Sequence, residues 1–254
     1  MTARREAILR EMGLAPVWKS RAAGEAAGSP APAPDSVGEG GVEGPEADVP
    51  STPSVAREAR ISRMDWPALK AAVPGCTACG LHKTRAQTVF GVGDENADWL
   101  VVGEAPGAEE DQTGEPFVGQ AGKLLDAMLS AIDLRRSVNV YIANVLKCRP
   151  PGNRNPEPAE VAQCAPHLRR QIELIRPKLI LAMGRFAVQT LLATDASIAS
   201  LRGKVHAYHG VPLIVTYHPA YLLRTLPDKA KAWQDLSFAF RTMGDLQAKA
   251  QAPI

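Results

Sequence analysis

DWLVVG, at residues 98–103, is the stretch of sequence that decides the fold class of this chain. A short apolar run that ends in glycine is typical of a strand buried on both faces of a parallel sheet. Helical and extended patterns alternate outward from it: a helix over 121–132, a strand over 138–145, a helix over 157–175, a strand over 178–183, a helix through 192, strands over 204–208 and 213–217, and a helix over 229–246. This alternation predicts an α/β protein, a three-layer α/β/α domain around a central, mainly parallel sheet. In such sheets, ligands bind beyond the carboxyl ends of the strands.

Residues 1–60 lie outside this alternation and are predicted to form an extension in front of a domain at 61–248. Within the extension, residues 22–56 are rich in Ala, Gly, Pro, Ser and Glu and contain no aromatic side chain. They cannot bury enough apolar surface to offset the entropy of ordering, so we expect a disordered linker there. Residues 3–19 have the apolar spacing of a short amphipathic helix. Residues 1–20 are then either a tethered peptide that binds a protein partner or a dispensable tail.

The charge of the chain gives only a weak indication of a partner. The net charge of +2 is too small to indicate nucleic acid, but acidic residues are concentrated between residues 22 and 60, which leaves the rest more basic. No apolar stretch approaches the ~20 residues of a membrane span. The sequence MTARREAILREMG at the N-terminus lacks the apolar core of a secretory signal. We therefore expect a cytoplasmic protein in a reducing compartment, where structural disulfides are rare.

The four cysteines have the spacing of ligands to a single metal centre. Cys76 and Cys79 form a Cys-x2-Cys pair on a loop-like segment, and Cys148 and Cys164 form a second pair farther along the chain. Converging thiolates bind either zinc or an iron–sulfur cluster, and spacing alone does not decide between the two. Four unrelated thiols are the alternative. Either metal centre would tie the segment before the first strand to the middle of the domain.

A glycine-rich loop follows the first strand directly. Residues 103–107 read GEAPG, and their backbone can approach a ligand closely. An acidic run at 109–111 and the segment GEPFVG at 114–119 come next. Phe117, framed by glycine and proline, can present its ring as a stacking surface, although a core phenylalanine in a turn fits the same pattern.

Asn144 and His218 stand where two other strands are expected to end. The amide of Asn144 offers both donors and an acceptor, as reading the edge of a nucleic-acid base requires. The imidazole of His218 can donate a hydrogen bond to a developing anion. A capping asparagine and a histidine without a function are the commoner outcomes for such residues. Arg149, Arg154 and Arg224 can contact phosphates, although surface arginines are usually just solvated.

Taken together, these segments resemble the uracil-DNA glycosylase superfamily, and most closely its family 4, the iron–sulfur type of bacteria and archaea. The resemblance covers roughly residues 65–245, and order, identity and cysteine spacing all agree. It is carried by Cys76-x2-Cys79, GEAPG at 103–107, GEPFVG at 114–119, NVLKCRPPGNRNP at 144–156, Cys164 and HPAYLL at 218–223. It implies a DNA-repair enzyme that hydrolyses the N-glycosidic bond of deoxyuridine in single- or double-stranded DNA, releasing uracil and leaving an abasic site. It also implies a monomer that acts at the bacterial nucleoid.

The resemblance assigns roles to particular residues. It decides for a 4Fe-4S cluster over zinc, with Cys76, Cys79, Cys148 and Cys164 as ligands. Phe117 would stack on the flipped uracil, Asn144 would bind its pairing edge and His218 would stabilise its oxygen. Glu110 would lie near C5, where a thymine methyl would clash. The whole uracil-binding set would be Gly103, Glu104, Ala105, Pro106, Gly107, Glu110, Phe117, Asn144 and His218; the catalytic set would be His218, Asn144 and Glu104; and the DNA contacts would be Arg149, Arg154 and Arg224.

One departure from the superfamily pattern concerns the attacking water. The best-known members carry an aspartate in the first motif to orient that water, whereas GEAPG has alanine at the corresponding place. Glu104 is a candidate for this task, and contact with the base alone is its other expected role. The competing hypothesis is a catalytically idle iron–sulfur protein that binds DNA or senses damage. A relative trapped covalently through its histidine would need a different first motif and an added basic loop, and a zinc-stapled interaction module is a remote fourth hypothesis.

Overall fold

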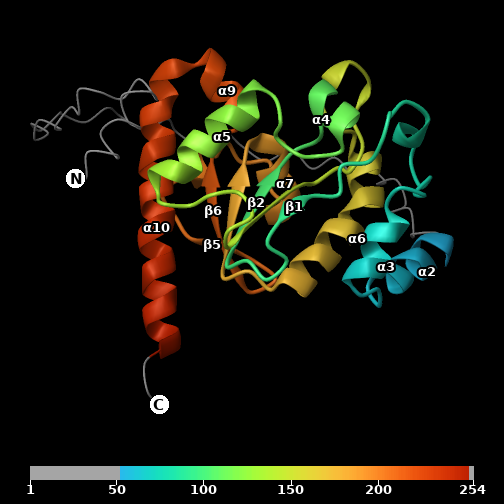
Figure 1. Cartoon of the computed structure of the whole chain (residues 1–254), viewed down its shortest axis with the longest axis horizontal. Helices are drawn as coiled ribbons and strands as arrows, with labels where there is room; N and C mark the ends of the chain where they lie inside the picture. Colours follow the sequence, from blue (N-terminus) through green and yellow to red (C-terminus); the bar gives the residue numbers. More distant parts are fainter. Residues whose placement is uncertain (1–51, 252–254) are drawn as a thin grey trace, which may run out of the picture.

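A six-stranded sheet forms the centre of the protein in a computed structural model that describes residues 52–251 (Figure 1). The strand order is β1-β3-β2-β4-β6-β5. The four inner strands are parallel: β3 (Val140–Asn144), β2 (Trp99–Gly103), β4 (Leu179–Met183) and β6 (Val211–Thr216). The edge strands β1 (Val92–Gly93) and β5 (His206–Tyr208) pair antiparallel to them. The predicted α/β class with a mainly parallel sheet is confirmed.

Helices cover both faces of the sheet, which makes the three predicted layers. Successive strand residues point to opposite faces, so neighbours such as Val101 and Val102 belong to different cores. On one face, Val101 and its equivalents pack against α5 (Gln120–Ala131) and α10 (Lys229–Gln251). On the other, Val102 and its equivalents pack against α6 (Pro158–Ile175) and α7 (Arg185–Leu192). Every residue of β2, β3 and β4 is buried, as their apolar composition predicts.

The remaining elements are short and lie before the sheet or in the loops between its strands. Near the start of the described chain, α2 (Thr52–Ile61) and α3 (Trp66–Ala72) pack against α6 through a small cluster of apolar side chains. The loop elements are η1 (Gly80–Lys83), α4 (Ala108–Thr113), η2 (Pro151–Asn153), α8 (Ile198–Leu201), α9 (Pro219–Arg224) and η3 (Leu226–Asp228).

Helix α2 differs from the sequence-based expectation. The disordered linker was expected to continue through residue 56 and the domain to begin at 61, whereas residues 52–61 are helical. The side chain of Ile61 is buried, and Arg57 Nη1 donates to the carbonyl oxygen of Gln163 on α6 over 2.9 Å. Tertiary packing therefore orders a stretch that composition alone marks as polar. The helix expected over 3–19 and most of the linker lie outside the described residues.

The hairpin at the C-terminal side of the sheet is tighter than expected. The strands were expected at 204–208 and 213–217, separated by a longer turn, but only His209 and Gly210 connect β5 to β6. Both have positive φ angles, 46° and 85°. Two-residue turns of this kind match the twist of the strands they join. Consequently β6 begins two residues early and ends at Thr216, directly before Tyr217 and His218.

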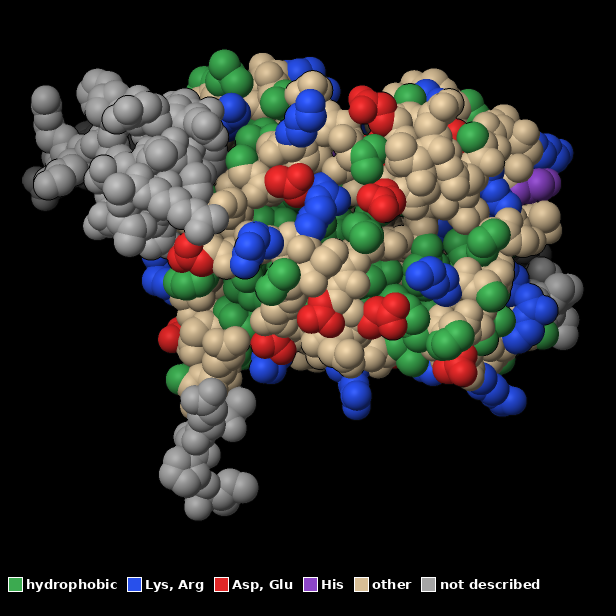
Figure 2. All heavy atoms as spheres, in the orientation of Figure 1, with side chains coloured by type: hydrophobic (Ala, Val, Ile, Leu, Met, Phe, Trp, Pro, Cys, Tyr) green, Lys and Arg blue, Asp and Glu red, His purple; other side chains and the backbone are tan. Residues whose placement is uncertain are grey.

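The surface shows no gathering of one charge in the view of Figure 2. Acidic and basic side chains are interspersed over this face, with apolar patches between them (Figure 2). Among the described residues, none of the helices combines the length and the apolar composition needed to cross a membrane.

Candidate functional site

A cavity of about 810 Å³ lies at the carboxyl edge of the sheet. It is lined by residues that follow β2, β4 and β6 and by the last residue of β3, as expected for this class of sheet. Eight of the nine residues predicted to bind uracil line it, namely Glu104, Ala105, Pro106, Gly107, Glu110, Phe117, Asn144 and His218. Gly103, the ninth, lies behind this lining. The structure therefore brings together side chains that are spread over more than a hundred residues of sequence.

Gly103 allows Phe117 and Asn144 to meet at the end of β2. A Cβ added at Gly103 would lie 2.5 Å from Phe117 Cζ and would overlap Asn144 Oδ1. Only glycine permits this approach. Phe117 itself has a φ of 57°, an uncommon conformation for a large side chain, and its ring is 5% exposed. The Phe117 ring stacks against the His218 ring, with centroids 5.4 Å apart and an interplanar angle of 27°.

Asn144 carries an unpaired polar atom in this cavity. The residue is 2% exposed, and its Oδ1 is buried without a hydrogen-bond partner. Buried acceptors are almost always paired, because leaving one unpaired costs about 1–3 kcal/mol. Asn144 lines the cavity, and an unpaired acceptor on such a residue is what a group that binds a ligand donor would have.

His218 is held in one tautomer by the start of α9. Its Nδ1 accepts a hydrogen bond from the backbone N–H of Ala220 over 3.1 Å. The neutral ring therefore carries its proton on Nε2. Burial and, to a smaller extent, the positive charge of Arg224 lower the pKa of His218 to about 4, although Glu110 opposes the shift. At neutral pH His218 is thus an uncharged ring with a single N–H donor.

Glu104 is the ionisable carboxyl group whose properties are most altered in this cavity. Burial raises its pKa to about 7, and the positive charge of Arg185 partly opposes the shift. A carboxyl group with a pKa near the working pH, lying in a cleft, is suited to exchange protons. Arg185 also lines the cavity. Arg185 belongs to none of the sequence motifs, and only its position two residues after the predicted strand at 178–183 indicates that it lies near the site.

Glu110 ties the two glycine-rich segments together. Its Oε2 accepts from the backbone N–H of Gly107 over 3.0 Å, and its Oε1 accepts from those of Val118 and Gly119 over 3.0 and 3.3 Å. The carboxylate is thus engaged by the backbone on both sides of Phe117. Proximity to the C5 atom of a base, which we expected for Glu110, stays a prediction.

Arg136 supports Phe117 from outside the cavity. Its guanidinium donates to the carbonyl oxygens of Pro116 and Phe117 over 2.9 and 2.5 Å and forms an ion pair with Asp126 over 2.7 Å. No sequence pattern indicates this role, because Arg136 belongs to none of the motifs. Together with Glu110 it holds the strained backbone of Phe117.

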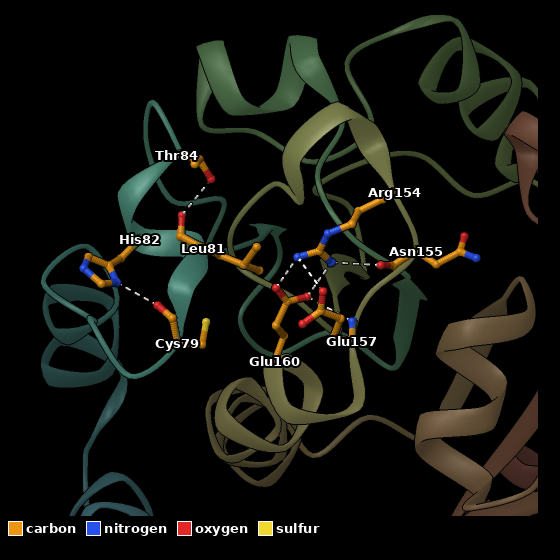
Figure 3. Close-up of polar contacts among 8 residues, drawn as sticks. All are labelled: Cys79, Leu81, His82, Thr84, Arg154, Asn155, Glu157 and Glu160. Carbon is orange, nitrogen blue, oxygen red and sulfur yellow. Dashed lines mark hydrogen bonds and ion pairs between the residues drawn. The ribbon is translucent and has the colours of Figure 1, made fainter.

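The three arginines expected to contact DNA have different surroundings. Arg154 donates to both carboxylate oxygens of Glu160 over 2.9 and 2.6 Å and also pairs with Glu157 (Figure 3). Arg149 donates to Asn153 Oδ1 over 2.7 Å and does not line the cavity. Arg224 lines the cavity and forms no ion pair among the described residues. Arg154 therefore fixes its own loop to the start of α6, and of these three arginines Arg224 is the one that lines the cavity without an ion pair among the described residues.

The four cysteines line one small cavity of their own, behind the loop that follows β3. They form no disulfide. Three of the sulfurs accept hydrogen bonds: Cys148 from Arg85 Nη1 over 3.0 Å, Cys164 from the Lys147 backbone N–H over 3.3 Å and Cys76 from Arg57 Nη2 over 3.5 Å. Within residues 52–251, no three His, Cys, Asp or Glu side chains converge closely enough to hold a single metal ion. The cysteines thus share a cavity without forming a one-ion site.

Comparisons with known proteins agree with this arrangement. The family model described as the uracil DNA glycosylase superfamily matches residues 90–237. The type-4 uracil-DNA glycosylase of Archaeoglobus fulgidus is 45% identical over 187 residues, which cover 70% of this chain and 92% of that protein. The type-4 uracil-DNA glycosylase of Thermotoga maritima is 47% identical over 154 residues, 60% of this chain and 80% of the relative. A type-5 uracil-DNA glycosylase of Thermus thermophilus is 32% identical over 152 residues, 52% of this chain and 69% of the relative.

Proposed function

The chain belongs to the uracil-DNA glycosylase superfamily, and from this premise we propose that the cavity at the carboxyl edge of the sheet is where it removes uracil from DNA. The enzyme is a DNA-repair glycosylase that hydrolyses the N-glycosidic bond of deoxyuridine in DNA. The observation that supports this site most directly is the unpaired, buried Oδ1 of Asn144, beside Phe117.

Recognition in this proposal is divided between a ring and an amide. A base inside a duplex is out of reach, so the deoxyuridine must be turned out of the helix at a cost of a few kcal/mol. Stacking of the base on Phe117 contributes roughly 1–3 kcal/mol of binding free energy, which offsets much of this cost. Asn144 Oδ1 accepts the N3–H of uracil, and its Nδ2 donates to O4. Cytosine presents the opposite pattern on this edge, so it would leave buried groups unpaired, at about 1–3 kcal/mol for each one.

His218 acts on the leaving group. As the N-glycosidic bond breaks, the sugar becomes cationic and uracil leaves as an anion. Nε2–H of the neutral His218 ring donates to the uracil oxygen on which this charge develops. Because Nδ1 is already held by the Ala220 N–H, the donor is oriented before the substrate arrives. Groups of this kind contribute roughly 10²–10³-fold in rate.

Glu104 is the group we propose for the water. With a pKa of about 7, its ionised form is available at neutral pH to orient the attacking water and to oppose the positive sugar. Alanine stands where the better-known enzymes carry an aspartate, and Glu104 is its neighbour in the same loop.

We also propose that the four cysteines hold a 4Fe-4S cluster. All four sulfurs line one shared cavity, and four cysteine thiolates are the ligand set that such a cluster takes. The N–H donors on three of the sulfurs suit thiolates. When bound, the cluster supplies a structural cross-link between the loop at 76–79, the segment after β3 and helix α6. A monomeric state and a place at the bacterial nucleoid complete the proposal.

The test uses a labelled oligonucleotide with one uracil, incubated with the iron-loaded protein and then treated with alkali. We expect strand cleavage with uracil and none with thymine, and the His218→Ala variant should be slower by roughly 10²–10³-fold. Absence of cleavage by protein with its full iron content would favour the catalytically idle DNA-binding hypothesis. Cleavage by His218→Ala at the unchanged rate would refute the role of His218 while leaving the activity established.

A further inference from the structure

Lys147 is a buried cation that has no role in the proposed reaction. It is 1% exposed and has the largest fully buried side chain among the described residues. A buried ammonium group is strongly disfavoured unless it is hydrogen-bonded and matched by negative charge. No carboxylate in the described part of the chain forms an ion pair with it. The burial of Lys147 must therefore be explained by the groups that it contacts, which are Asn144 and the four cysteines.

The first neighbour is Asn144. Lys147 Nζ donates to the Asn144 backbone carbonyl over 2.8 Å. The following residues are fastened to the first site loop, because Val145 N–H donates to the Gly103 carbonyl and Leu146 N–H to that of Glu104, each over 3.0 Å. Asn144 is buried at the end of β3, where its backbone carbonyl needs a hydrogen-bond donor. The lysine side chain folds back and supplies it.

The second neighbour is the group of four cysteines. Lys147 lines their cavity, and its backbone N–H donates to Cys164 Sγ over 3.3 Å. Burial disfavours its charged form, and the groups whose negative charge would oppose this effect are the thiolates of Cys164 and Cys148. Four thiolates that bind a metal centre stay deprotonated. They can therefore supply the counter-charge that Lys147 lacks elsewhere.

We propose that Lys147 is a positioning residue that couples the cysteine centre to uracil recognition. The charge of the centre holds the ammonium group in place, and the ammonium group fixes the backbone of Asn144, whose side chain reads the base. This inference rests on the proposed function, since it uses the assignment of Asn144 to uracil. Coupling between two sites is reciprocal, so bound uracil must in turn strengthen the hold on the cluster.

The wild-type protein, loaded with iron, provides the first test. Iron release to a chelator is followed by visible absorbance, with and without saturating free uracil, and thymine serves as the control base. We expect uracil to slow release by about 5-fold or more, the lower range of such couplings, and thymine to have no effect. An unchanged rate with uracil bound overturns the coupling. Calorimetry that finds no uracil binding overturns the proposed site as well, which is a different result.

Three variants locate the coupling. Lys147→Met keeps the length of the side chain but removes its charge and its hydrogen-bond donor. Lys147→Arg keeps the charge and the donor. Arg85→Met removes a hydrogen-bond donor to Cys148 Sγ and leaves the contact between Lys147 and Asn144 in place. Lys147→Met should bind uracil about 10-fold more weakly and lose the protection by uracil, whereas Lys147→Arg should keep both properties. Arg85→Met should release iron faster and still be protected by uracil. Equal loss of uracil affinity in Arg85→Met and Lys147→Met overturns the role of Lys147, as does loss of protection in Lys147→Arg. If Lys147→Met does not fold, the wild-type measurement and the Lys147→Arg variant still test whether Lys147 couples the two sites.

Discussion

Replacing Gly122 with alanine should displace the aromatic ring on which uracil is proposed to stack. Gly122 lies in the first turn of α5, and a Cβ there would overlap the Phe117 carbonyl oxygen and lie 3.1 Å from Phe117 Cα. Phe117 cannot yield easily, because Arg136 holds the same carbonyl over 2.5 Å. Overpacking of this kind costs about 1–3 kcal/mol, against the gain of about 1 kcal/mol that alanine has over glycine in a helix.

The matched control is Gly244→Ala in α10, where an added Cβ meets nothing within 4 Å. For a domain of this size, 1 kcal/mol shifts Tm by roughly 2–4 °C. Gly244→Ala should therefore raise Tm by about that amount, whereas Gly122→Ala, with a net cost of up to about 2 kcal/mol, should lower Tm by up to roughly 8 °C. A displaced Phe117 also loses stacking worth roughly 1–3 kcal/mol, so kcat/KM on a uracil oligonucleotide should fall about 5- to 150-fold.

Thermal melting followed by circular dichroism and alkaline cleavage of a labelled oligonucleotide measure the two effects. A Gly122→Ala variant that melts as high as Gly244→Ala and excises uracil at the wild-type rate would refute the close packing of α5 against Phe117. A variant that melts lower but keeps its kcat/KM would refute the stacking role alone.

Three further predictions address the other supports of the site. Arg136→Met removes the donors to the Pro116 and Phe117 carbonyls. The free energy of unfolding, measured in urea, should therefore fall by about 1–3 kcal/mol, and calorimetry should find weaker uracil binding. Unchanged values in both measurements would contradict this role of Arg136. Burial raises the pKa of Glu104 from 4.5 to about 7, so its ionisation opposes folding and wild-type stability declines as pH rises through that range. Glu104→Gln lacks this decline, and its Tm should gain on that of the wild type as pH rises, whereas a constant Tm difference would argue against the shift. Cys148→Ser should lower both the iron content and Tm, and full iron loading of this variant would exclude Cys148 as a ligand.

The sequence predicts the sheet well because its strands are buried on both faces. The runs that become β2, β3 and β4 are largely apolar, with Asn144 at the very end of β3, and each strand appears within two residues of its expected bounds. Since parallel strands end at one edge, Glu104, Asn144 and His218 could be expected to meet. Phe117 joins them through the loop after α4, which the resemblance supplied and the periodicity did not.

The parts that could not be predicted depend on which partner a polar side chain finds. The phosphate contact expected for Arg154 stays a prediction, and the sequence patterns do not show that its Nη1 and Nη2 also donate to the carboxylate of Glu160. Glu110 reads as a specificity residue, but the backbone N–H of Val118 reaches it only once the loop has folded back. Lys147 follows a buried strand in a position where sequence patterns favour a surface residue. Periodicity and motifs do not show which of several possible partners a polar side chain contacts in the folded chain.

The short edge strands of the sheet limit the tendency of the protein to aggregate at high concentration. Its two edges are formed by β1, with two residues, and β5, with three. An exposed edge strand is a template on which another chain can add a strand, and long, flat edges are the usual start of aggregation. Here each edge offers only a few backbone groups, and β5 is turned back tightly at His209 and Gly210. Copies of this enzyme therefore offer one another little free edge on which their sheets could join.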